Sequence, residues 1–171
     1  AAKMLSKLAE NAKEEGPRAE YLKRLGLVQV ALEKWEKADD ALHKALAIRE
    51  ADAEIHAALG RLYEAQGQWT RAVSFYESAL KVTKNRREAG DLVFRAAHIL
   101  AEKLQDKKRS VELYEELLES NPGHPEAVRA LATHYYGEED WDKALPLLHV
   151  VVTESESLPK AERLSLLIQA G

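Results

Sequence analysis

The sequence predicts an all-α protein built as a solenoid of repeated helix pairs. Three observations support this prediction: a 34-residue internal period, apolar residues at helical spacing, and no window with the two-residue alternation of a half-buried strand. The period matches large, small and aromatic residues in two successive segments: Leu25 with Leu59, Gly26 with Gly60, Trp35 with Trp69, Ala38 with Ala72, Ala45 with Ala79, and Leu46 with Leu80. Because one such unit cannot bury its apolar face alone, neighbouring units must stack.

Each unit is predicted to contain two helices separated by a short polar break. Ala72, Tyr76, Ala79 and Leu80 recur at positions i, i+4, i+7 and i+8, which places them on one face of an α-helix. The breaks are expected near 33–34, 66–68, 105–107 and 137–140. Small residues at fixed phase indicate close helix contacts, and the recurring tryptophans are interpreted as packing residues beside them.

A single array is expected over residues 1–171, with complete repeats at 19–52, 53–86, 91–124 and 125–158. Trp69 and Trp141 are 72 residues apart, four more than two periods, so an insertion is placed at 87–90. The repeat at 91–124 is divergent, because Lys107 and Ser110 stand where its neighbours carry tryptophan and alanine. Residues 1–18 are expected to belong to a preceding unit, and 159–171 to begin a further unit or form a capping helix.

The motifs Leu59-Gly60-x-x-Tyr63 and Gly67-x-Trp69-x-x-Ala72 resemble the tetratricopeptide repeat (TPR), a 34-residue helix–turn–helix. The resemblance covers about residues 19–158. It implies a right-handed superhelical solenoid in which the first helix of each unit lines a concave groove. In that family the groove often holds an extended peptide or a partner helix, so the resemblance implies a protein-binding function.

The groove positions of the family can be transferred to this chain by their phase within the repeat. They are Lys23, Arg24, Leu27, Ala58, Arg61, Arg95, Ala96, Ile99, Arg129, Ala130 and Thr133. The basic residues would form a cationic line, and the alanines would leave room for a ligand backbone. A protein or peptide with acidic and small apolar side chains would therefore fit. The alternative is that these are ordinary solubilising charges, some of them paired with Glu64 and Glu102.

Composition and motifs exclude several other classes of function. The formal net charge of −4 gives no attraction to nucleic acid, and no apolar run is long enough for membrane insertion. Cysteine is absent, and the six histidines show no paired ligand spacing, so no metal site is expected. Neither a phosphate-binding glycine loop nor a nucleophilic serine motif occurs. We therefore predict no enzyme activity and no cofactor.

The predicted function is a noncatalytic scaffold for protein–protein interaction. Two alternatives stay open. The chain could be a spacer or self-assembly segment of a longer array, associating through incomplete repeats at its ends. It could instead be the regulatory domain of a larger enzyme. A soluble protein is expected, with a cytoplasmic location favoured.

Overall fold

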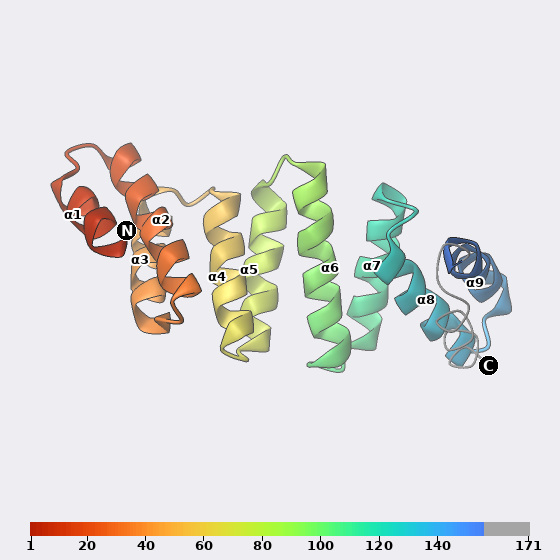
Figure 1. Cartoon of the computed structure of the whole chain (residues 1–171). Helices are drawn as coiled ribbons and strands as arrows, with labels where there is room; N and C mark the ends of the chain where they lie inside the picture. The colour runs from red at the N-terminus through yellow and green to blue at the C-terminus, as the bar shows by residue number, and fades with distance from the viewer. Residues whose placement is uncertain (156–171) are drawn as a thin grey trace. The chain divides into compact units, whose positions relative to one another are not determined.

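The computed structural model describes residues 1–155, and every regular element in that range is an α-helix (Figure 1). The helices are α1 (Ala2–Asn11), α2 (Glu15–Ala31), α3 (Trp35–Ile48), α4 (Ala53–Ala65), α5 (Trp69–Val82), α6 (Arg86–Glu102), α7 (Lys107–Ser120), α8 (Pro125–Gly137) and α9 (Trp141–Ser155). The predicted all-α fold class is confirmed. The further unit or capping helix expected at 159–171 lies outside the described residues.

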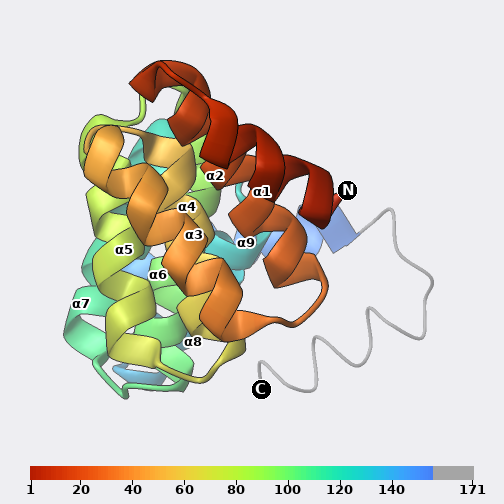
Figure 2. The same ribbon diagram turned by 90° about the vertical axis from the view of Figure 1, so that its left-hand side faces the viewer.

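The chain forms two compact units, and the boundary falls between α6 and α7. In the first unit, 1–105, α2 packs on α3, α4 packs on α5, and α6 packs on α5. Helix α1 lies against α2 at the N-terminal end of this unit (Figure 2). In the second unit α8 packs against both α7 and α9. Residues 87–90, the expected insertion, lie in the first turns of α6.

The turns that follow α2, α4, α6 and α8 repeat one backbone feature. One residue per turn has a positive φ: Glu33 (54°), Gly67 (70°), Gln105 (57°) and Glu139 (58°). In three turns the amide that follows donates to a carbonyl five residues earlier, from Lys34 to Gln29 (2.9 Å), from Gln68 to Tyr63 (2.8 Å) and from Asp140 to Tyr135 (2.9 Å). This is the Schellman ending of a helix, in which a left-handed residue lets the last carbonyls be satisfied.

Glycines at matched positions allow the two helices of a pair to approach closely. A Cβ atom on Gly60 would lie 2.5 Å from the Tyr76 ring, and one on Gly26 would lie 2.5 Å from Leu42. Alanines at fixed phase are fully buried between the same helices, at Ala38, Ala45, Ala72 and Ala79. These residues bring the helix backbones together and let interdigitated side chains set the helix geometry.

The tryptophans are less buried than the sequence pattern predicts. Trp35 and Trp69 are half-buried, and Trp141 is 47% exposed. The interpretation of Trp141 as a core residue is therefore wrong. Its ring stands at the start of α9 and meets the edge of Tyr136 at a centroid distance of 5.3 Å, so it covers a neighbouring side chain at the surface.

Candidate functional site

Lys23, the first of the predicted groove residues, lies in an ion cluster between α2 and α4. Its Nζ donates to Glu54 at 2.6 Å and lies 3.2 Å from Glu20 and 3.8 Å from Asp52. Only 8% of Lys23 is exposed. Arg49 enters the same cluster, 3.4 Å from Glu20 and 3.7 Å from Asp52. The charge of Lys23 is neutralised inside the protein, so this residue joins two helices instead of offering a free cation.

Proton affinities in the cluster follow from these contacts. Burial alone would lower the pKa of Lys23, but hydrogen bonds to Glu54 and Glu20 outweigh it and raise the pKa above its ordinary 10.5. The pKa of Glu20 falls below its ordinary value of 4.5, chiefly because Arg24 donates a hydrogen bond to the carboxylate. Both partners are therefore charged at neutral pH.

The other predicted groove residues divide by burial. Three are buried in helix packing, with exposed fractions of 2% or less: Ala58, Ala96 and Ile99. Leu27 and Ala130 are half-buried. The exposed ones are Arg24, Arg61, Arg95, Arg129 and Thr133. Arg129 donates to the carbonyl of Pro125 in its own helix at 3.3 Å. The first unit holds the predicted residues from Lys23 to Ile99, and the second holds Arg129, Ala130 and Thr133.

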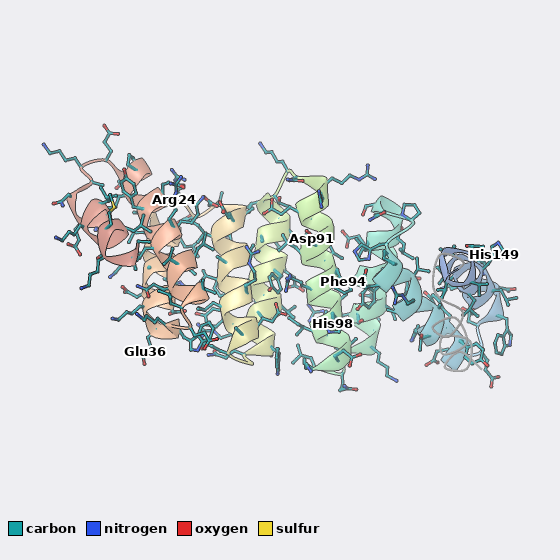
Figure 3. The ribbon with its side chains drawn as sticks, in the orientation of Figure 1. Arg24, Glu36, Asp91, Phe94, His98 and His149 are labelled. Carbon is teal, nitrogen blue, oxygen red and sulfur yellow. The ribbon has the colours of Figure 1, made fainter. Side chains whose placement is uncertain are left out.

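The structure brings Arg61 and Arg95 together at a hollow between α4 and α6 in the first unit. This α4/α6 hollow encloses about 420 Å³, and Ala57, Arg61, Glu64, Tyr76, Glu88, Asp91, Leu92, Phe94, Arg95 and His98 line it. Asp91, Phe94 and His98 follow one side of α6 (Figure 3). Phe94 and His98 stack with ring centroids 5.9 Å apart. The hollow thus combines two arginines, an aromatic pair and several carboxylates.

Glu64 is held by two partners on the wall of the α4/α6 hollow. The Tyr76 hydroxyl donates a short hydrogen bond to Glu64 Oε2, and Arg95 Nη1 lies 3.2 Å from the same oxygen. Burial and the bond to Glu64 raise the pKa of Tyr76 far above its ordinary value, so the hydroxyl stays protonated and keeps donating. Arg61 forms no ion pair within residues 1–155, which leaves its guanidinium open to a ligand.

A second arrangement, which the sequence pattern did not reveal, joins a tyrosine to one acid and one cation. Tyr63 donates to Asp39 and accepts from Arg71 Nη2 at 2.6 Å. In the second unit, Tyr135 donates to Glu115 and accepts from Lys143 Nζ at 3.4 Å. The cation follows the tyrosine by eight residues in both cases, a spacing that could have signalled the arrangement.

Each tyrosine bridge joins the helix that carries the tyrosine to the helix before it and the helix after it. Burial and the bond to Asp39 raise the pKa of Tyr63 to about 12, and burial and the bond to Glu115 raise the pKa of Tyr135. Both hydroxyls therefore stay protonated at neutral pH and keep donating to their carboxylates. The His43 ring also contacts Tyr63 Oη at 3.1 Å and is used in this packing.

No group of three or more metal-ligating side chains occurs in the part of the chain that the structure describes. Among the described helices, none is both long and apolar enough to cross a membrane. The candidate site is the α4/α6 hollow, a surface of charged and aromatic side chains.

Paired helices, a recurring left-handed turn and glycine at the close contacts define a helix–turn–helix solenoid. Comparison with known proteins names the family, since the tetratricopeptide repeat model matches residues 55–89 and a second model of the same repeat matches 96–159. The chain belongs to the tetratricopeptide repeat family, whose members typically serve as non-enzymatic scaffolds for protein interaction.

Individual proteins of this kind resemble the chain over most of its length. The TPR repeat-containing protein YpiA of Bacillus subtilis (strain 168) is 27% identical over 106 residues, which is 62% of this chain and 24% of YpiA. The chain thus spans about a quarter of the length of that relative. A solved structure of MamA superposes with a TM-score of 0.74 at 17% identity, covering 91% of this chain and 86% of MamA. YrrB, described as a TPR protein with an unusual peptide-binding site, superposes with a TM-score of 0.72 at 22% identity, covering 95% and 79%.

Proposed function

We propose that the chain binds an acidic, extended segment of a partner protein along the exposed faces of its first helices. The observation that carries the proposal is the α4/α6 hollow, where the unpaired Arg61 stands beside Arg95. Arg95 already contacts Glu64, so a ligand carboxylate would compete with an exposed ion pair, which contributes little. Arg61 has no such competitor in the described chain and would be the principal anchor.

The remaining walls of the hollow suit the rest of a peptide. The stacked Phe94 and His98 offer an aromatic surface, and the small Ala57 side chain in the lining leaves room for a ligand backbone. YrrB supports a peptide as the ligand, because it shares the fold and is described as peptide-binding. In the second unit Arg129 and Thr133 are exposed on α8 and would offer that unit's own contacts to a partner. Buried Lys23, Ala58, Ala96 and Ile99 would act as scaffold beneath it.

Charge reversal at the hollow tests the proposal. A fluorescent peptide with alternating aspartate and alanine serves as the probe, and anisotropy measures its affinity for the whole chain. Combined Arg61→Glu and Arg95→Glu should weaken binding about tenfold or more, because two attractive contacts become repulsive. The matched control is Arg86→Glu with Arg87→Glu, which makes the same charge change on exposed positions of α6 outside the hollow.

Equal losses in the two double variants would show that binding follows net charge alone and would refute the site. Circular dichroism should show unchanged helicity in both. Combining Arg95→Glu with Arg129→Glu then asks whether the two units contribute together. If both do, this pair should weaken binding more than Arg95→Glu alone.

Self-association is a second candidate function, favoured by an apolar face on α1. Met4 is 68% exposed and Leu8 is 37% exposed, while Ala9 on the other side of the helix is buried. Sedimentation over a range of protein concentrations tests this candidate. Replacing Met4 and Leu8 by glutamate should abolish any increase of the sedimenting mass with protein concentration. An increase that remains in this variant would place the self-association surface outside this face of α1.

A further inference from the structure

Three of the differences between the first and second helix pairs of the first unit, compared at a spacing of 34 residues, lie close together in the structure. Where the second pair has Tyr63, Arg71 and Phe75, the first has Gln29, Lys37 and Ala41. In the second pair the Tyr63 and Phe75 rings stack at a centroid distance of 5.3 Å, and Arg71 Cζ lies 3.8 Å from the Tyr63 ring centroid. The first pair thus lacks both rings but keeps the cation.

The structure shows a hollow at the place that these rings occupy in the next repeat. It lies between α1, α2 and α3, encloses about 570 Å³, and is named here the N-terminal hollow. Gln29, Lys37 and Ala41 all line it, together with Leu22, Leu25 and Ala9. Its floor is therefore apolar, and the space corresponds to two aromatic rings replaced by smaller side chains.

Gln29 supplies the polar group of this floor and is incompletely bonded. Its side chain is only 8% exposed, and Oε1 is buried without a hydrogen-bond partner in the described chain. Buried side-chain amides normally find partners, because an unmade hydrogen bond in a water-poor site costs free energy. The equivalent Tyr63 has its hydroxyl bonded to both Asp39 and Arg71. An external donor would satisfy Gln29 in the same way.

The rim of the N-terminal hollow is basic in a chain of net charge −4. Three acidic residues line it, against five cationic ones, which are Lys3, Arg18, Lys34, Lys37 and Lys44. Lys44 pairs with Asp40 at 2.7 Å. The other four make no ion pair within the described residues, so their charges are open to an anionic partner.

The N-terminal hollow is separate from the predicted peptide groove. Leu22, Leu25 and Gln29 recur at three- and four-residue spacing on one side of α2. At 100° per residue, Arg24 and Leu27 project from the opposite side. A ligand in this hollow would therefore leave the groove side of α2 uncovered, and its binding does not depend on the function proposed above.

We propose that the N-terminal hollow binds a tyrosine side chain of a partner peptide whose neighbouring residues are acidic. The ring would enter the space that Tyr63 and Phe75 fill in the next repeat, with Lys37 placed to contact its face as Arg71 contacts Tyr63. The phenol hydroxyl would donate to Gln29 Oε1. Acidic flanking residues would meet the open cations of the rim.

Two probes of the full chain test the proposal: p-cresol, which is the tyrosine side chain in free form, and the peptide Glu-Asp-Tyr-Asp-Glu. Chemical shifts of the Gln29 side-chain amide should move with both probes. The peptide should bind more tightly than its phenylalanine analogue by about threefold to tenfold, the effect of one hydrogen bond. Lys37→Glu should weaken the peptide more than it weakens p-cresol, and added salt should weaken the peptide as well.

Ala41→Phe and Gln29→Tyr are the blocking variants, since each restores a residue that the second repeat carries at that place. Both should abolish binding while circular dichroism stays unchanged; the Gln29 amide reports on Ala41→Phe, and the Leu22 and Leu25 shifts report on Gln29→Tyr. Ala47→Phe is the matched control, because Ala47 is exposed on α3 outside the hollow, and it should bind both probes as the parent does.

Binding that persists in both blocking variants would overturn the proposal, and so would shifts that avoid Gln29, Leu22 and Leu25. Equal affinity for peptides with tyrosine, phenylalanine and leucine at the anchor would reduce the hollow to a nonspecific apolar surface. Absence of binding by either probe at millimolar concentration would also refute it.

Discussion

The first repeat, α2 and α3, and the second repeat, α4 and α5, share one backbone plan but fill the space beside their first helix differently. The second repeat fills it with stacked aromatic rings and a bridged tyrosine hydroxyl. The first repeat has Gln29 and Ala41 there and leaves a hollow. The comparison teaches that the positions fixing the backbone, such as Gly26 and Gly60, are distinct from those that decide how complete the packing is.

The largest expected effect tests how much the filled space contributes to stability. Tyr63→Ala removes a ring that is 1% exposed together with its hydroxyl contacts to Asp39, Arg71 and His43, so it should lower the free energy of unfolding by about 3–5 kcal/mol. Gln29→Ala should cost no more than about 1 kcal/mol, because it also removes an unbonded buried oxygen. Urea unfolding followed by circular dichroism measures both. Similar losses would mean that the two sites are equally well packed.

Replacing the glycines at the close helix contacts should give the next largest loss of stability. In Gly60→Ala the new methyl group meets the Tyr76 ring, which is fully buried, so we expect a loss of about 1–3 kcal/mol. In Gly26→Ala the new methyl group meets Leu42, whose aliphatic side chain can change rotamer. The better helix propensity of alanine then offsets about 1 kcal/mol of the loss in unfolding free energy. The melting temperature should therefore fall further for Gly60→Ala. The reverse order would show that Leu42 is the more rigid neighbour.

The ion cluster that joins the two repeats predicts a pH dependence. Lys23→Met should cost about 1 kcal/mol at pH 7, since its partners are partly exposed. Because the pKa of Glu20 is lowered in the folded state, its contribution to the free energy of unfolding is complete above pH 4.5. That contribution is lost as the pH falls through the pKa of the folded state. Because the pKa of Lys23 is raised in the folded state, its contribution to the free energy of unfolding is complete below pH 10.5. That contribution is lost as the pH rises through the pKa of the folded state.

The difference in unfolding free energy between the parent and Lys23→Met should consequently be level between about pH 4.5 and 10.5 and shrink outside that range. Lys44→Met, which breaks an exposed pair with Asp40, provides the control and should change stability by no more than about 0.5 kcal/mol. A difference that already shrinks near pH 7 would contradict these shifts.

The smallest expected effect concerns the turns of the same two repeats. Glu33 holds a positive φ of 54° where the second repeat has Gly67 at 70°. Glu33→Gly should stabilise the first repeat by about 0.5–1 kcal/mol, and Gly67→Ala should destabilise the second by a similar amount. Thermal unfolding of the two variants measures both signs. A loss on Glu33→Gly would indicate that the Glu33 side chain contributes more than its backbone strain costs.

Periodicity was sufficient to predict the helix pairs, because each pair depends on residues close together in sequence. Gly26, Gly60 and the buried alanines all stand at one phase, and their packing role follows from that phase. The same argument misjudged Trp141, since the ring is exposed although it keeps the phase of Trp69. The position of a residue within the repeat determines on which side of its helix the side chain lies, whereas its burial depends on which neighbouring side chains cover it.

The site was harder to predict, because its partners come from different repeats. Lys23 was expected to line a groove, but Glu54, 31 residues later, draws it into a cluster. Ala58 and Ala96 were expected to leave room for a ligand, yet both are buried. The bridge from Tyr63 to Asp39 also crosses between two repeats. Such pairs require knowledge of which helix faces meet, and a single sequence does not contain it.

The recurring left-handed turn has a consequence for measuring how the array opens. The amides of Lys34, Gln68 and Asp140 each donate to a carbonyl five residues earlier, at 2.9, 2.8 and 2.9 Å. Each exchanges its hydrogen with solvent only when its own turn opens, so the three serve as equivalent local reporters. Comparing their exchange rates would map fraying and cooperative unfolding one repeat at a time.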